Sequence, residues 1–172
     1  MSSYVRRTKT YIAFDGDADL MCYRTIQSWS ADPKYPFHLN DAHEINYARD
    51  DSLPESIISQ LRERMDASKN VVLIIGSQTN RNRKGILQWE IGYAVRHGLP
   101  IILAFKGYSA DTLATEELWQ TCLLPLIPKT LRDRANDAYC LVSPLTRNAV
   151  CSAIHKYSNT DLPSQGYTWY WH

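Results

Sequence analysis

Short apolar runs alternate with helical patterns along the chain. Five runs rich in apolar or β-branched residues predict strands at residues 10–14, 37–39, 71–75, 101–105 and 139–142. The runs 71–75 and 101–105 are continuously apolar, which is typical of strands buried on both faces of a parallel sheet. Helical spacing of apolar residues predicts helices that begin near residues 20, 53, 85, 116, 130 and 143. The alternation predicts an α/β fold, a doubly wound, mostly parallel five-stranded sheet with helices on both faces.

Local signals mark where several of these helices begin and end. Ser52 and Glu55 form a capping box before the second helix. Gly98 is expected to terminate a helix that runs from about residue 85 to residue 97. Pro125 is expected to stop the helix at 116–124, and Ser143 with Pro144 to start the last helix.

The length of 172 residues suits a single domain with a real core. We expect this domain to span residues 1–157. Residues 158–172 are polar and then aromatic, and we expect them to form a C-terminal tail packed on the domain.

Composition and charge exclude several classes of function. Apolar residues make up 44% of the chain and charged residues 22%, as in ordinary soluble domains. The net charge of +1 provides no long-range attraction to nucleic acid or to acidic membranes. No apolar run reaches the roughly 18 residues of a membrane helix. The four cysteines are widely spaced, so we expect reduced, mostly buried thiols in a cytoplasmic protein.

Ligands of doubly wound sheets bind beyond the carboxyl ends of the strands, so we expect binding residues in the loops that follow the strands. The first of them, residues 15–19, holds three aspartates and one glycine. It matches neither GxGxxG nor GxxxxGKS/T, and its carboxylates would repel a phosphate. Leu20 and Ile26 stand where an EF-hand needs glycine and glutamate. Two interpretations remain: a phosphatase of the haloacid dehalogenase type with Asp15 as nucleophile, or carboxylates that cap the following helix.

A glutamate stands in the helix at residues 85–97. Leu87, Ile91, Ala94 and Val95 share the face expected to pack on the sheet, and Glu90 lies at the flank of that face. At this position Glu90 is either a half-desolvated carboxylate that points into a cleft or an exposed side chain that pairs with a nearby basic residue. Trp89 points away from the sheet, which indicates a subunit contact or a position under the tail. Three basic residues before this helix are candidates for holding an anion, namely Arg81, Arg83 and Lys84.

Short motifs in a particular order carry a family resemblance. The first begins at Tyr11 and reads Tyr-Ile-Ala-Phe-Asp-Gly-Asp-Ala-Asp. A second, Val-Val-Leu-Ile-Ile-Gly-Ser-x-Thr, begins at Val71 and is followed by Trp89-Glu90-Ile91 and by Leu99-Pro-Ile-Ile. In this order, residues 9–105 resemble TIR-like domains of bacteria, in particular the stand-alone proteins of the ThsB type from the Thoeris antiphage system.

The resemblance implies a flavodoxin-like TIR fold and an activity. Catalytic members cleave the nicotinamide–ribose bond of NAD⁺, which is a substrate and not a cofactor. Some of them cyclise the ADP-ribose product into a messenger that activates an effector protein. Glu90 matches the family's essential glutamate, although Trp89 stands next to it here and not four residues before it. The resemblance also makes pocket candidates of residues at strand ends and in loops, namely Phe14, Asp15, Asp19, His43, Asn46, Arg49, Ser77 and Asn80.

Two alternatives accompany this expectation. A nucleoside deoxyribosyltransferase-like enzyme would also direct a helical glutamate at a ribose, but it would act on a free nucleoside. A non-catalytic TIR-like module would act by self-association or partner binding through surfaces such as Trp89. Under all three interpretations we expect no bound metal, no nucleic-acid partner and no membrane partner, and a homo-oligomer is compatible with each of them.

Overall fold

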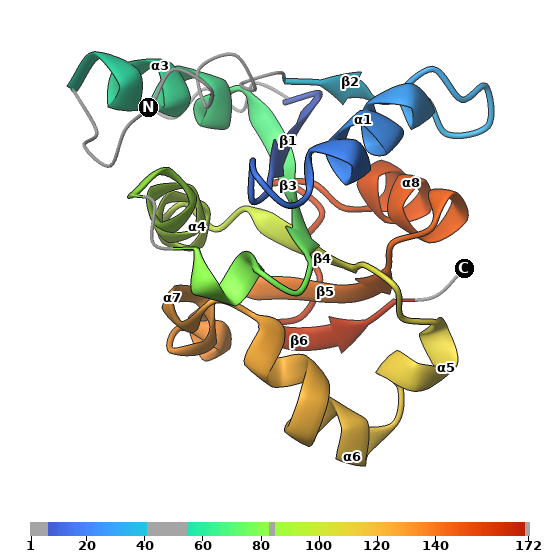
Figure 1. Cartoon of the computed structure of the whole chain (residues 1–172). Coiled ribbons are helices and arrows are strands. Elements are labelled where there is room, and N and C mark those ends of the chain that lie inside the picture. The colour runs from blue at the N-terminus through green and yellow to red at the C-terminus, as the bar shows by residue number, and fades with distance from the viewer. Residues whose placement is uncertain (1–6, 41–54, 83–84, 171–172) are drawn as a thin grey trace.

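A computed structural model describes residues 7–40, 55–82 and 85–170 of the chain. One parallel sheet of six strands forms its centre, in the order β2-β1-β3-β4-β5-β6 (Figure 1). The strands are β1 Lys9–Ala13, β2 His38–Leu39, β3 Ser68–Ile75, β4 Pro100–Phe105, β5 Tyr139–Pro144 and β6 Gly166–Trp169. The α/β flavodoxin-like fold expected from the sequence is confirmed, with one strand more than expected.

Helices cover both faces of the sheet and create two core layers. One face packs against α3 (Glu55–Asp66) and α4 (Gly85–Arg96), and the other against α1 (Leu20–Trp29) and α8 (Arg147–Lys156). Strand β3 supplies both layers, because Val71, Leu73 and Ile75 face the α3/α4 side while Val72 and Ile74 face the α1/α8 side. The continuously apolar run at 71–75 is therefore explained by burial on both faces.

Short helical turns connect β4 to β5. They comprise α5 (Ala110–Leu113), α6 (Glu116–Leu118), a π-helical turn η2 (Trp119–Leu123), two 3₁₀ turns η3 (Leu124–Leu126) and η4 (Ala135–Asp137), and α7 (Lys129–Arg132). The single helix expected at 116–124 is thus broken, and Pro125 lies inside η3 and does not end the segment. The helix expected at 130–138 is likewise reduced to α7 and η4.

Helix ends agree with the sequence signals in one case and differ in another. Gly98 adopts a φ of +65°, and Leu99 N–H donates to Ala94 C=O at 3.0 Å, so glycine ends α4 as expected. The last helix does not begin at residue 143, because β5 continues through Pro144. Thr146 caps α8 instead, with its hydroxyl oxygen accepting from Ala149 N–H. Ser52, the cap expected for α3, lies outside the described residues.

The C-terminal segment contributes a strand. β6 pairs in parallel with β5, with Tyr167 opposite Cys140, and Tyr170 N–H donates to Val142 C=O at 2.9 Å. Tyr167 and Trp169 place their rings edge-on against Trp119, at centroid distances of 5.2 and 4.9 Å. The segment was expected to pack on the domain as a tail, whereas it extends the sheet itself.

All four cysteines are free, and Cys140 and Cys151 are buried while Cys122 is exposed. Within the described ranges, no helix combines the length and the apolar character needed to cross a bilayer.

Deleting residues 158–172 tests whether this segment is part of the sheet. The deletion removes the partner of β5 and two aromatic neighbours of Trp119, and each lost aromatic pair contributes about 0.5–1.5 kcal/mol in addition to the lost burial. We expect the thermal midpoint to fall by about 10 °C or more in a thermal unfolding experiment. A midpoint within about 3 °C of the full chain would mean that the segment is only a surface strap.

Candidate active site

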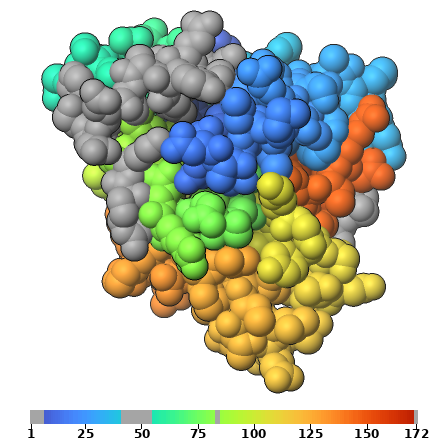
Figure 2. All heavy atoms as spheres, viewed as in Figure 1, coloured from blue at the N-terminus to red at the C-terminus, as the bar shows by residue number. Residues whose placement is uncertain are grey.

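Three loops meet at the carboxyl edge of the sheet. They follow β1, β3 and β4, and Figure 2 shows their blue, green and yellow segments side by side on the face toward the viewer. Their meeting is a consequence of parallel strands, whose carboxyl ends all lie at one edge. The turn η1 (Thr79–Arg81) belongs to the second of these loops.

Asp15 organises the loop after β1. One carboxylate oxygen accepts the backbone N–H groups of Asp17 at 3.0 Å and of Ala18 at 2.9 Å. The other oxygen accepts the side-chain amide of Asn82 at 3.0 Å, which ties this loop to the loop after β3. Because both oxygens are engaged by N–H donors, the arrangement favours a structural turn over a phosphatase nucleophile.

Asp19 is the second buried carboxylate of this edge, with 2% of its surface exposed. Its carboxylate lies 3.4 Å from the Thr79 hydroxyl and 3.8 Å from Nζ of Lys106. Burial raises the pKa of Asp19, and the charge of Lys106 partly opposes the rise. A Cβ added at Gly76 would lie only 2.6 Å from Oδ1 of Asp19, so this packing requires glycine.

Other residues expected at the site lie apart from these aspartates. Phe14 stacks on Tyr23 with ring centroids 4.7 Å apart, in the core layer of α1 and α8. Ser77 is exposed, and the side-chain amide of Asn80 donates to Pro125 C=O at 2.7 Å. Several expected residues lie outside the described ranges, namely His43, Asn46, Arg49, Arg83 and Lys84.

Glu90 is buried in the core layer between α4 and the sheet. Only 1% of its surface is exposed, so it is neither the surface residue nor the half-desolvated flank residue that the spacing allowed. Its neighbour is the phenol of Tyr11 on β1, which is also buried. Burial, and next the negative charge of Glu90, hold the pKa of Tyr11 well above its usual range. A buried carboxylate beside a phenol is a costly arrangement and one that is typical of functional sites.

Trp89 has a different environment from its neighbour Glu90. It is partly buried and stacks on Tyr93 with ring centroids 4.9 Å apart, and Tyr93 stacks in turn on His97 at 4.0 Å. The Tyr93 hydroxyl donates to Asp66 at the end of α3. Strand β6 of the C-terminal segment is at the edge of the sheet opposite β2, so Trp89 does not lie under the part of this segment that the structure describes. Its role as an interface residue stays a prediction.

Sequence reasoning missed four residues that the structure brings into these arrangements: Tyr11, Thr79, Asn82 and Lys106. Lys106 directly follows β4, and Thr79 and Asn82 lie in the loop after β3. Because the carboxyl ends of parallel strands meet at one edge of the sheet, these three residues could have been predicted to lie near the aspartates. Nothing local distinguishes Tyr11 from an ordinary strand tyrosine, because its significance depends on Glu90 across the core. In the described part of the chain, no group of three or more His, Cys, Asp or Glu side chains is placed to hold a metal ion.

Replacing Asp19 by asparagine tests the electrostatics of the carboxyl edge. A raised pKa means that Asp19 stabilises the fold when protonated and that this stability is lost as the pH rises through its folded-state pKa. We therefore expect the thermal midpoint of Asp19→Asn, relative to the native chain, to increase between about pH 4 and about pH 7. Asp17→Asn, in the same loop but exposed, is the control and should show no such trend. If the difference in thermal midpoint between Asp19→Asn and the native chain stays constant over this pH range, the raised pKa of Asp19 is contradicted.

The chain is similar to a solved structure and to a known protein family. A crystal structure described as a conserved protein from Enterococcus faecalis V583 is 16% identical, with a TM-score of 0.46, and the match covers 86% of this chain and 97% of that one. The family model of the TIR-like domain of the Thoeris protein ThsB matches residues 11–110. This range includes β1 from Tyr11 onward, the loop after it, β3 and the helix that carries Glu90. The chain therefore belongs to the family of Thoeris ThsB TIR-like domains.

Proposed function

We propose that this protein consumes NAD⁺, cleaving the bond between nicotinamide and ribose with Glu90 as the catalytic residue. The observation that carries the proposal is the burial of the Glu90 carboxylate beside Tyr11, at 1% exposure, because burying a carboxylate costs free energy that an apolar side chain would not cost. Membership in the ThsB family supports it, because catalytic members of the TIR-like proteins that this chain resembles have an essential glutamate on the helix that corresponds to α4.

One carboxylate is sufficient for this chemistry. When the glycosidic bond breaks, positive charge develops on the ribose, and a nearby carboxylate stabilises that charge or attacks the anomeric carbon. Ordinary glycosides also need an acid that protonates the leaving oxygen. Nicotinamide needs none, because it departs as a neutral molecule from a cationic ring.

The acceptor of the ADP-ribosyl group determines the product. Water would give ADP-ribose, whereas a ribose hydroxyl or an adenine nitrogen of the same molecule would give a cyclic product. A cyclic ADP-ribose-type signal, made in the cytoplasm and read by a separate effector protein, is the output we propose for antiphage defence.

Tyr11 supplies a positioning role in this proposal. Because its pKa is held above the neutral range, the phenol stays protonated and can donate a hydrogen bond toward a neighbouring carboxylate. A donor there would fix the orientation of Glu90 and moderate its basicity. The carboxylate would then stabilise a cation without taking up a proton.

Burial of Glu90 also limits access. With 1% of its surface exposed, the carboxylate can reach a ribose only after the surrounding side chains move. We therefore propose that the described conformation is a resting state and that turnover requires a rearrangement, such as one that follows phage infection. Assembly into a homo-oligomer is one event that could drive it.

The decisive experiment compares small molecules by mass spectrometry in cells that express the native chain or Glu90→Gln, with and without phage. We expect NAD⁺ loss and a new ADP-ribose species with the native chain, and a decrease on the order of a hundredfold or more with Glu90→Gln. Glu63→Gln, an exposed glutamate of α3, is the matched control and should behave as the native chain. Unchanged NAD⁺ in infected cells, with the native protein present and folded, would sink the proposal.

The same variant separates a catalytic from a structural role for Glu90. Removing a buried charge should leave the thermal midpoint unchanged or raise it, because desolvation of the carboxylate is no longer required. A silent but equally stable Glu90→Gln protein indicates lost chemistry. If Glu90→Gln protects cells normally and Trp89→Ala does not, the protein is a binding module and not an enzyme.

Tyr11→Phe tests the positioning role. The substitution keeps the ring in the core and removes only the hydroxyl, so we expect a folded protein with about tenfold to hundredfold less NAD⁺ loss. The rate should also become more dependent on pH in the acidic range, since Glu90 would lose a donor that favours its charged form. An unchanged rate and pH profile would assign Tyr11 to packing alone.

A further inference from the structure

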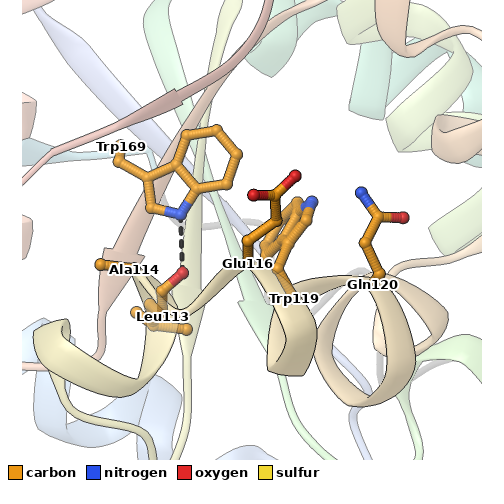
Figure 3. Close-up of a pocket in the computed structure, with 6 residues that line it drawn as sticks. All are labelled: Leu113, Ala114, Glu116, Trp119, Gln120 and Trp169. Carbon is orange, nitrogen blue, oxygen red and sulfur yellow. Dashed lines mark hydrogen bonds between the residues drawn. The ribbon is translucent and has the colours of Figure 1, made fainter.

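A pocket of about 400 Å³ lies at the other end of the sheet from Glu90. It is enclosed by α5, by α6 with the first turn of η2, and by the end of β6 (Figure 3). The lining residues are Leu113, Ala114, Glu116, Trp119, Gln120 and Trp169. The pocket lies at the carboxyl end of β6, where parallel sheets bind their ligands. None of its residues takes part in the arrangement proposed for NAD⁺ cleavage.

Two tryptophans form a corner of the pocket. Their rings meet at 67° with centroids 4.9 Å apart. Trp119 is buried and also contacts Phe105 edge-on at 5.9 Å, so its position is fixed by the core. Trp169 is 38% exposed, yet its indole N–H donates to Leu113 C=O at 2.8 Å (Figure 3), which fixes its ring as well. Two aromatic walls are therefore held in place before any ligand arrives, which reduces the entropy lost on binding.

The pocket also contains two side chains that can accept hydrogen bonds, those of Glu116 and Gln120. Glu116 and Gln120 are four residues apart, so their side chains lie on the same side of the helical segment and both line the pocket. Both residues are exposed and are therefore accessible to a ligand. Of the six residues that line the pocket, Glu116 is the one that carries a charge. The local charge favours a cation.

We propose that this pocket binds a guanidinium group. A guanidinium is planar and can stack on an indole face, and its N–H groups can donate to the carboxylate of Glu116 and the amide oxygen of Gln120. A trimethylammonium group has no N–H donor and would leave both acceptors unused. A neutral nucleobase could stack on an indole face, but it would gain nothing from the negative charge of Glu116. The guanidinium is either that of a free small molecule or that of an arginine on a second protein.

Titration of the full-length protein with N-acetyl-L-arginine N-methylamide tests the proposal. This probe presents the side chain without charged ends, and binding is followed through the indole N–H signals of Trp119 and Trp169 in ¹H–¹⁵N spectra. The citrulline derivative is a neutral isostere and should bind at least about tenfold more weakly. The lysine derivative should also be weaker, because an ammonium group does not stack on the indole.

Two substitutions change the acceptors without touching the core. Glu116→Gln should weaken binding of the arginine probe by about tenfold, and Gln120→Glu should strengthen it, since each changes the charge beside the guanidinium. Glu117→Gln is the matched control, because Glu117 is the next residue along the chain and does not line the pocket. Equal affinity of the citrulline derivative, or equal loss of affinity in the Glu116 and Glu117 variants, would overturn the proposal.

Two further probes identify the source of the cation. A short peptide with a central arginine should bind more tightly than the capped amino acid if the occupant is a protein side chain. Agmatine should bind at least as tightly as either if the occupant is a small molecule. Because NAD⁺ loss depends on Glu90 and probe binding on Glu116, the failure of one proposal leaves the other intact.

Discussion

The constraint on which this structure depends is that β3 and β4 are buried on both faces. Every side chain of β4 and nearly every one of β3 is withdrawn from water, so helices must cover the sheet on both sides. Helical crossovers make the strands parallel, and parallel strands bring their carboxyl ends to one edge. The network of Asp15 and Asp19 with residues that follow β3 and β4 is therefore a result of the same burial that stabilises the core.

The sequence predicts those parts of the fold whose signals are local. The apolar runs of β3 and β4 and the glycine that ends α4 fall where expected, because periodicity and a left-handed residue can be recognised without knowledge of neighbours. Strand β6 is not predicted from the sequence, because three of its four residues are only partly buried and Trp169 is exposed. Its pairing with β5 also joins residues 27 positions apart, as with Tyr139 and Gly166. The π-helical turn at Trp119 is not predicted for a similar reason, since its surroundings come from residues distant in the sequence. The ring of Trp119 packs edge-on against Tyr167 of β6 and Phe105 of β4, and the helical pattern of the segment does not reveal these contacts with distant strands.

At the candidate site, too, the sequence does not reveal contacts between distant segments. Helical spacing placed Glu90 at the flank of α4, where exposure and burial were both open, and the resemblance to a family singled it out. What spacing could not give is its partner, since Tyr11 belongs to a strand that meets α4 only in the folded chain. Likewise, the aspartates after β1 could be located from the sequence, whereas the tie between Asp15 and Asn82 depends on loops that the sheet brings together. Chemistry that depends on two distant segments is assembled by tertiary structure.

The parallel arrangement of the sheet has a consequence for the kinetics of folding. Each pairing joins strands with at least one helix between them along the chain, and β1 pairs with β3 across residues as distant as Thr10 and Asn70. Such contacts form only after long loops have closed, so sheets of this kind fold more slowly than helical bundles of equal size. Until then the most apolar segments of the chain are exposed as unpaired strands, which are prone to aggregate. The burial that stabilises the native sheet is thus also what makes the newly synthesised chain vulnerable.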